Sequence, residues 1–160
     1  MNPAPMIASM LRATGTEYAN LTTGTTTRML VNPQQSAQLL APTGTAVQRG
    51  DILRDFEGNY LLVTDTQTSA KCLYINVYPA DHILTLPDGS TTPAALDSTT
   101  TAPASAASVV AGGRPADVYV YVVPSSIPIS IGDTLTTATG TVRVRRTNTD
   151  DGLTRLEVVA

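Results

Sequence analysis

The sequence predicts an all-β protein, a small antiparallel β-barrel or sandwich, because it repeats a glycine hairpin, alternates apolar residues and is rich in β-branched residues. The repeat begins with Gly50-Asp51-Ile52-Leu53 followed by Gly58, and returns as Gly132-Asp133-Thr134-Leu135 followed by Gly140. Each copy predicts a short strand, a glycine turn, a second strand, a loop and a third strand. Because turn glycines and alternating apolar positions are what recur, the duplicated element is a scaffold.

Aligning the two copies on their glycines places Tyr60 opposite Val142 and Leu62 opposite Val144. One residue of slippage in the next loop then aligns the third strands as well. Residues that share the inward phase in both copies are expected to form the core: Leu53, Leu62, Ile75, Leu135, Val144 and Leu156.

At 160 residues and 16.7 kDa, the chain is expected to form a single β domain over residues 1–160. Residues 1–20 form an amino-terminal arm or a short helix that Gly15 would end, and the apolar pattern leaves both possible. Weak strands follow at 27–31 and 37–40. Repeat unit 1 is expected over residues 47–78 and repeat unit 2 over 127–160, ending in a strand at 153–159.

Between the repeat units the composition changes to Thr, Ala, Ser and Pro over residues 84–114, which predicts a loosely extended insertion loop. A segment with so little core-forming power would be ordered by packing against other chains. The strand at 117–123 that follows alternates and then becomes wholly apolar before Pro124.

The sequence offers little material for catalysis or metal binding. It has one histidine and one cysteine, so we interpret His82 as a loop residue beside Asp81 and Cys72 as a small core residue. The carboxylates at 51, 55 and 57 do not follow the calcium-loop spacing. No nucleophile elbow, P-loop, dinucleotide fingerprint or aspartic-protease turn occurs. We therefore expect no enzyme activity, no cofactor and no structural metal.

Charge and hydropathy narrow the class of partner. The formal net charge is −3 and charged residues make up only 14% of the chain, so much of the surface must be weakly polar or apolar, and such surface is often covered by a partner. The acidic balance argues against a protein that mainly neutralises phosphates. We expect a soluble chain made in a cytoplasm, with no membrane association, because it has no long apolar run and no signal-peptide pattern.

Two sets of residues are candidates for subunit interfaces. The strand at 60–63 is apolar on both faces and is expected to be covered on both. This hairpin therefore either sits mid-barrel or meets another subunit, and the second alternative makes Leu61 and Val63 interface candidates. The second set is a basic cluster that faces outward and comprises Arg143, Arg145, Arg146 and Arg155. These arginines either meet carboxylates of a neighbouring subunit or nearby DNA, or form a solvated strand face, which is the simpler interpretation.

The segment Val47-Gln48-Arg49-Gly50-Asp51-Ile52-Leu53, with Gly58-Asn59-Tyr60 and Val63, resembles the Gly-Asp hairpin of small β-barrel proteins in tailed-bacteriophage necks. These are head-closure (stopper) proteins of the head-tail connector. The resemblance covers about 27–78 and again 127 to the end, whereas the insertion at 84–114 departs from the compact form of the family.

The resemblance implies a virion structural protein that forms a homo-oligomeric ring of about six or twelve copies, contacts portal or adaptor and tail proteins, and seals the DNA channel with possible non-specific contact to DNA. A capsid decoration protein or a tail or baseplate subunit stays an alternative. A surface-binding β module is another, with its aromatic candidates being Tyr18, Tyr74, Tyr78, Tyr119 and Tyr121.

Overall fold

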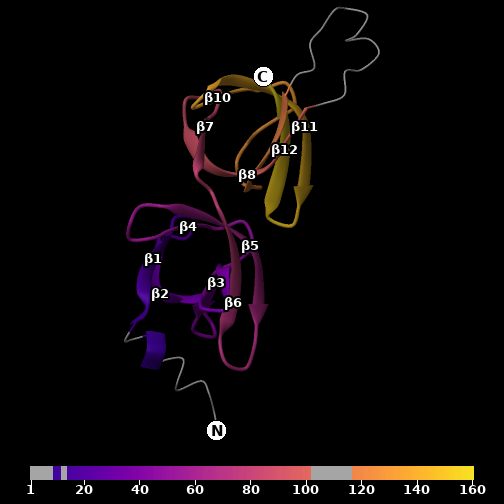
Figure 1. The fold of residues 1–160 in the computed structure, drawn as a ribbon. Coiled ribbons are helices and arrows are strands. Elements are labelled where there is room, and N and C mark those ends of the chain that lie inside the picture. Colours follow the sequence, from indigo (N-terminus) through magenta and orange to yellow (C-terminus); the bar gives the residue numbers. More distant parts are fainter. Residues whose placement is uncertain (1–8, 12–13, 102–116) are drawn as a thin grey trace, which may run out of the picture. The chain divides into compact units, whose positions relative to one another are not determined.

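The computed structural model describes residues 9–11, 14–101 and 117–160, and it is almost entirely β (Figure 1). The chain divides into two compact units, Met1–Ala80 and Asp81–Ala160. The prediction of an all-β barrel protein is confirmed, but the prediction of one domain is wrong. Each half of the chain closes a barrel of its own, so the repeat spans a whole unit rather than a hairpin and one further strand.

The first barrel closes in the order β1-β2-β3-β6-β5-β4. All its strand pairs are antiparallel, and β1 returns to β4 through the pairs Ala19–Arg54 and Asn20–Leu53. Its strands are β1 (Thr16–Asn20), β2 (Thr25–Asn32), β3 (Gln35–Ala41), β4 (Ile52–Arg54), β5 (Tyr60–Thr68) and β6 (Leu73–Pro79).

The second barrel has the same order, β7-β8-β9-β12-β11-β10 read from its first strand, and it closes through the pair Thr85–Thr136. Both barrels also carry a β-bulge in the same strand, after Val63 in the first and after Val144 in the second. The strands are β7 (His82–Thr85), β8 (Thr91–Thr101), β9 (Asp117–Pro124), β10 (Thr134–Thr137), β11 (Gly140–Asp150) and β12 (Leu153–Val159).

The prediction of an insertion loop over residues 84–114 is therefore wrong over much of its length. Residues 84–101 supply the end of β7 and all of β8, which lies between β7 and β9 in the second barrel. Threonine is β-branched and suits a strand whose apolar cover comes from its neighbours. The rest of the predicted loop, residues 102–114, lies outside the described residues.

Each barrel has its own hydrophobic core. The first gathers Tyr18, Met29, Leu39, Ala41, Leu53, Val63, Leu73, Ile75 and Val77. The second gathers Leu84, Leu86, Ala94, Tyr121, Val123, Leu135, Val142, Val144, Leu156 and Val158. All six residues predicted to be buried are buried, and each is at most 1% exposed.

The predicted alignment of the two hairpins is wrong by one residue. Leu53 pairs with Leu61 in the first barrel, whereas its counterpart Leu135 pairs with Val142 after a loop one residue shorter. Leu62 thus corresponds to Arg143, and Val63 corresponds to Val144. Leu62 is fully buried, but it lies opposite Ile52 and outside the barrel core.

The Gly-Asp turn is the most closely repeated local structure. Gly50 and Gly132 both have φ +93°, a conformation that favours glycine. Gly50 donates its N–H to the carbonyl of Val63 at 2.9 Å, and Gly132 donates to that of Val144 at 2.8 Å. Gly58 and Gly140 also have positive φ, at 89° and 141°, although the loops around them differ in length.

The amino-terminal segment contains a helical turn at Ser9–Leu11 that ends at Gly15. The Gly15 N–H donates to the Leu11 carbonyl at 3.0 Å, and a Cβ at this position would lie 2.3 Å from that oxygen. Leu11 is buried, whereas Met10 is 46% exposed. The helix alternative for this segment is confirmed over these residues, and residues 1–8 lie outside the described residues.

Candidate interaction surface of the second barrel

The predicted basic cluster lies on the outer side of β11 and β12. Arg143, Arg145 and Arg146 are exposed on β11, and Arg155 is exposed on β12. Strand alternation explains their direction, because Val142 and Val144 point into the core between them. The bulge after Val144 then turns Arg145 and Arg146 outward together. We call this surface, with Asp97 and Glu157, the arginine face.

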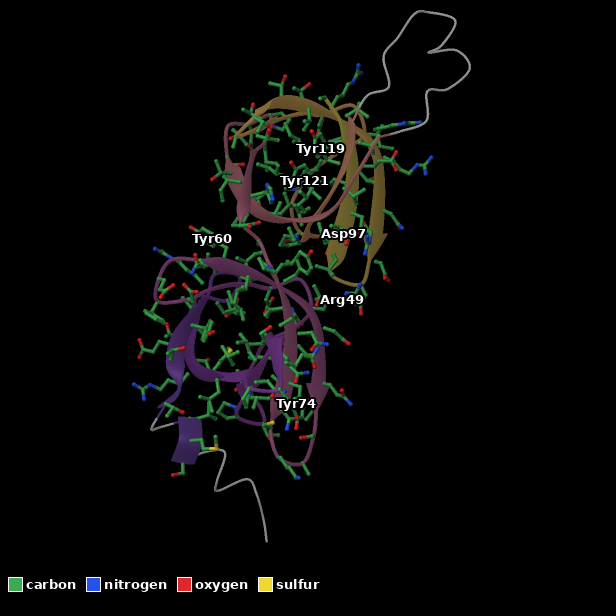
Figure 2. The ribbon with its side chains drawn as sticks, in the orientation of Figure 1. Arg49, Tyr60, Tyr74, Asp97, Tyr119 and Tyr121 are labelled. Atoms are coloured by element: carbon green, nitrogen blue, oxygen red, sulfur yellow. The ribbon has the colours of Figure 1, made fainter. Side chains whose placement is uncertain are left out.

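Two of the four arginines are neutralised within the face. Arg155 forms an ion pair with Asp97 of β8, and Arg145 Nε lies 3.8 Å from Glu157 Oε1 (Figure 2 labels Asp97). In the part of the chain that the structure describes, Arg143 and Arg146 form no ion pair. The face therefore carries surplus positive charge at these two side chains. Exposed ion pairs of this kind stabilise a fold little, so their main effect is on what binds.

A shallow hollow of about 220 Å³ lies in the arginine face and is lined by Val120, Arg146, Asn148, Arg155 and Glu157. The sheet register brings these residues together, since Arg146 stands opposite Glu157 and Asn148 opposite Arg155. Two guanidinium groups beside an amide and a carboxylate suit a partner with paired polar groups of its own. The hollow is too open to enclose a small molecule.

The same surface of the first barrel has a different chemistry. Asp65 and Tyr74 occupy the positions of Arg146 and Arg155, as the matching strand pairs show. Neighbouring strands are linked there by an amide ladder, in which Asn32 Nδ2 donates to Gln38 Oε1 at 2.6 Å and Gln38 Nε2 donates to Asn76 Oδ1 at 3.0 Å. The two barrels thus present unlike outer faces on one scaffold.

The other pair of interface candidates lies inside the first barrel. Val63 is fully buried in the core, and Leu61 packs against that core. Of the two alternatives for this hairpin, burial inside the barrel is the one observed. The one-residue error in the predicted alignment had placed both side chains on the outer side. The buried outer pair of this hairpin is Ile52 and Leu62.

The Gly-Asp carboxylates serve structure in both barrels. Asp51 is 2% exposed, and its Oδ2 accepts hydrogen bonds from Asn20 Nδ2 at 2.8 Å and from the Gln48 N–H at 3.0 Å. Asp133 accepts only the corresponding bond, from the Ser130 N–H at 2.8 Å, among the described residues. The Arg-Gly-Asp tripeptide at 49–51 therefore hides its carboxylate.

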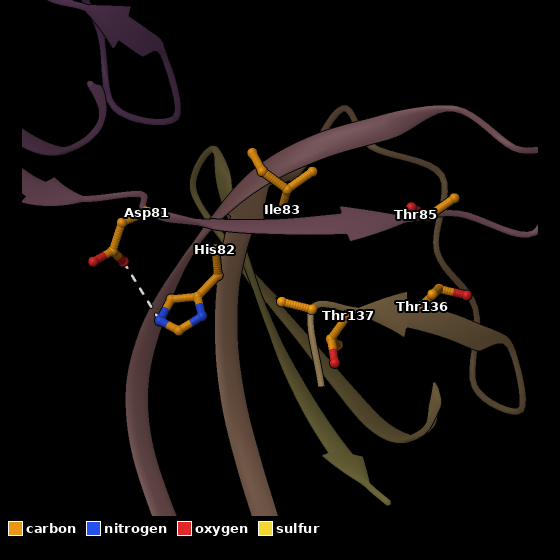
Figure 3. A pocket seen from close by; sticks show the side chains of 7 residues that line it. Asp81, His82, Ile83, Thr85, Thr136 and Thr137 are labelled. Atoms are coloured by element: carbon orange, nitrogen blue, oxygen red, sulfur yellow. Dashed lines mark ion pairs between the residues drawn. The ribbon is translucent and has the colours of Figure 1, made fainter. Parts of the chain in front are cut away.

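A second hollow, of about 350 Å³, lies where β7 meets β10 and is lined by Asp81, His82, Ile83, Thr85, Thr136, Thr137 and Ala138 (Figure 3). His82 Nε2 lies 3.4 Å from Asp81 Oδ1, and the imidazole meets the ring of Tyr121 edge-on at 5.6 Å. His82 begins β7, so it is not the free loop residue that the sequence suggested. Among the described residues, no hydrogen bond joins the imidazole to a threonine hydroxyl of this hollow, so His82 does not activate a hydroxyl nucleophile here.

The tyrosines do not form an aromatic platform. Tyr18 and Tyr121 are buried in the two cores, and Tyr119 packs against the second core, stacked 6.4 Å from Tyr121 (Figure 2). Burial raises the pKa of Tyr121, and Tyr119 adds to this effect. Of the five predicted candidates, Tyr78 is exposed at 45% and Tyr74 is half-buried. A carbohydrate-binding surface would need several such rings side by side.

Among the described residues, no group of three or more metal-ligating side chains lies together, and no helix is long and apolar enough to cross a membrane. Comparison with family models, with curated proteins and with solved structures gives no match. Sequence reasoning found the four arginines but missed Asp97 and the amide ladder. Asp97 lies 58 residues from Arg155, and Gln38 lies 38 residues from Asn76, so only the barrel topology brings these pairs together.

Proposed function

We propose that this chain is a structural protein of a tailed-phage virion, with head closure in the neck as its role. The observation that carries the proposal is the Gly-Asp hairpin, which occurs in both barrels with the same φ at Gly50 and Gly132 and the same hydrogen bonds. This hairpin is the element that resembles the stopper proteins of phage necks. The duplication supports the proposal further, because the core and the turns are repeated while the outer faces differ.

In this role the chain acts through surfaces rather than through a reaction. A ring subunit needs unlike surfaces, since a heterologous contact joins one patch to a different patch on the next copy. The amide ladder of the first barrel and the arginine face of the second are unlike in this sense. Neighbouring portal, adaptor or tail proteins would supply carboxylates to the arginines without an ion pair, and the channel DNA would supply phosphates.

The test is a charge reversal at Arg143, which is exposed and lies outside both barrel cores. We expect Arg143→Glu to lower the number of copies in purified particles, or to make filled heads leak DNA. Lys71→Glu is the matched control, because it makes the same charge change at an exposed residue of the first barrel. Absence of the intact protein from purified virions would refute the assignment.

The alternatives separate in the same preparation. A decoration protein would be found on tailless heads and would be dispensable for retaining DNA. A tail or baseplate subunit would be found on isolated tails. A neck protein is expected on filled heads that have not yet joined a tail.

A further inference from the structure

The edge of β11 beyond Val144 is open. β10 covers β11 only as far as Arg143, and the last bonds on this side join Val144 to Gly132 and Asp133 at 2.8 and 2.9 Å. From residue 145 to 150, β11 pairs with β12 alone in the part of the chain that the structure describes. These residues are exposed apart from Thr147, which is half-buried. An open strand edge is a template for another strand.

The hairpin geometry identifies the backbone groups that face the open side. Asp150 and Leu153 flank a two-residue turn, Asp151-Gly152, with φ values of 37° and 86°. Such a turn joins a hydrogen-bonded pair, and the bonding alternates along the strand. Asn148 and Arg146 therefore also bond to β12. Thr147 and Thr149 direct their N–H and C=O groups to the open edge.

We propose that two copies of this chain associate by antiparallel pairing of these β11 edges about a two-fold axis. Thr147 of one copy exchanges backbone hydrogen bonds with Thr149 of the other, and the reverse pair repeats them. Asn148 then stands opposite itself, and Arg146 stands opposite Asp150 on the same side of the joined sheet. The contact is self-complementary, as a two-fold interface requires.

Charge selects this register over its neighbours. If Thr147 paired with itself, Arg146 would face Asn148, and if Thr149 paired with itself, Arg146 would face Gly152. Neither arrangement places opposite charges together. A parallel, in-register stack would set arginine against arginine, which is unfavourable. Residues 145–150 contain no proline or lysine, which often block pairing at a strand edge. Their charges favour one antiparallel register over its neighbours.

Asp150 has a further interaction within its own chain. A carboxylate has two oxygens and accepts several hydrogen bonds, so this interaction is compatible with a guanidinium from a second copy. Arg146 is exposed and forms no ion pair among the described residues.

The first barrel provides an internal control. In the described part of the chain its β5 also pairs beyond Val63 with one neighbour alone, β6. Asp65, Gln67 and Ser69 hold the positions of Arg146, Asn148 and Asp150. The corresponding two-fold pairing would set Asp65 against Ser69, with no opposite charges. We expect no self-association through this edge.

The first experiment is a charge-swap cycle read by sedimentation velocity at low salt, over concentrations up to about 1 mM because a short edge contact is weak. Arg146→Asp and Asp150→Arg should each raise the dimer dissociation constant at least about tenfold, because each places like charges opposite one another. An equimolar mixture of the two variants should form a heterodimer, since opposite charges then face across both positions. Failure of the mixture to associate would overturn the charge register.

The second experiment removes one outward N–H. Thr147→Pro deletes a donor that points away from β12, so the barrel keeps its own ladder, and edge strands tolerate proline. The variant should sediment as a monomer, whereas Thr66→Pro at the matching position of β5 should dimerise like the parent chain. A monomeric parent chain at 1 mM, or an unchanged dimer in Thr147→Pro with a native circular dichroism spectrum, would overturn the proposal. The test uses purified protein and does not depend on the virion assignment.

Discussion

Asp51 and Asp133 occupy the same turn in the two barrels, and replacing each with alanine compares a buried carboxylate with a half-buried one. Asp51→Ala removes the acceptor for Asn20 Nδ2 and for the Gln48 N–H. Asn20 is itself 3% exposed, and its Oδ1 accepts the N–H groups of Thr22 and Thr23 at 3.0 and 3.2 Å. The carboxylate therefore anchors the tight loop that leaves β1 next to β4, where the first barrel closes.

The expected loss of stability follows from the hydrogen-bond donors that Asp51→Ala leaves unpaired. A hydrogen bond to a charged group contributes about 1.5 to 3 kcal/mol, and a buried donor without a partner costs about 1 to 3 kcal/mol. The cost of burying the carboxylate itself offsets part of this sum. We expect Asp51→Ala to destabilise the first barrel by about 3 kcal/mol. Asp133→Ala loses one exposed bond and should cost about 1 kcal/mol or less in the second barrel.

The assay is hydrogen exchange followed by mass spectrometry across a urea series, because it reports the opening of each barrel separately. Peptides from β1 and β4 report on the first barrel, and peptides from β10 and β11 report on the second. Asp51→Asn is the conservative variant, since an amide oxygen can still accept from the Gln48 N–H. It should recover part of the loss.

Equal destabilisation of the two barrels by the two alanine variants would refute this reasoning. It would mean that the bond to the backbone N–H three residues earlier carries the whole effect, and that the Asn20 contact contributes nothing. A loss in the second barrel from Asp51→Ala would show that the two units do not open independently.

Three further outcomes are expected. Leu53→Ala and Leu135→Ala should each destabilise their own barrel by about 2 to 5 kcal/mol, because both side chains are fully buried, and urea unfolding that shows losses below 1 kcal/mol would contradict the cores described above. Gly132→Ala should destabilise the second barrel by about 1 to 2 kcal/mol, since its φ of +93° strains any residue with a Cβ, and an unchanged thermal midpoint would count against this. Burial acts to raise the pKa of Asp55, but hydrogen bonds from the Asn59 side chain and from nearby N–H groups outweigh it and lower the pKa below the usual 3.8. Stability from Asp55 is then present above pH 3.8 and lost as the pH falls through the lower value, so the small gap between the parent chain and Asp55→Ala should close in acid, and a gap that widens in acid would refute the assignment.

The alternation of apolar residues and the positions of glycine and proline were enough to predict the strands near the two hairpins. The strand expected at 153–159 is observed as Leu153–Val159, and that expected at 117–123 is observed as Asp117–Pro124. Burial of five of the six predicted core residues followed from the same alternation, whereas Leu62 is buried on the outer side of its hairpin. The register error arose because a loop shortened by one residue shifts every side chain after it to the other face, which exchanged the roles of Leu61 and Leu62.

The sequence did not show that the whole barrel is duplicated, because the large side chains stand at different positions in the two cores. Tyr18 and Met29 in the first core correspond to Leu84 and Ala94 in the second, as the pairings of β1 with β2 and of β7 with β8 show. Leu39 corresponds in turn to Tyr121. Such exchanges keep a core filled while removing sequence identity, since cores tolerate changes that conserve total volume.

The outer faces follow a different rule, and this difference bears on function. A core substitution must be compensated by a neighbour, whereas a surface substitution away from special features changes stability by about 0.5 kcal/mol or less. The replacement of an Asp65 and Tyr74 face by an Arg146 and Arg155 face therefore needed no compensation within the fold. Differences of this kind accumulate freely or are selected by what the surface meets. Within the arginine face, Arg155 pairs with Asp97 and Arg145 pairs with Glu157. In the described part of the chain, Arg143 and Arg146 form no ion pair, so selection by a partner is best tested at these two arginines.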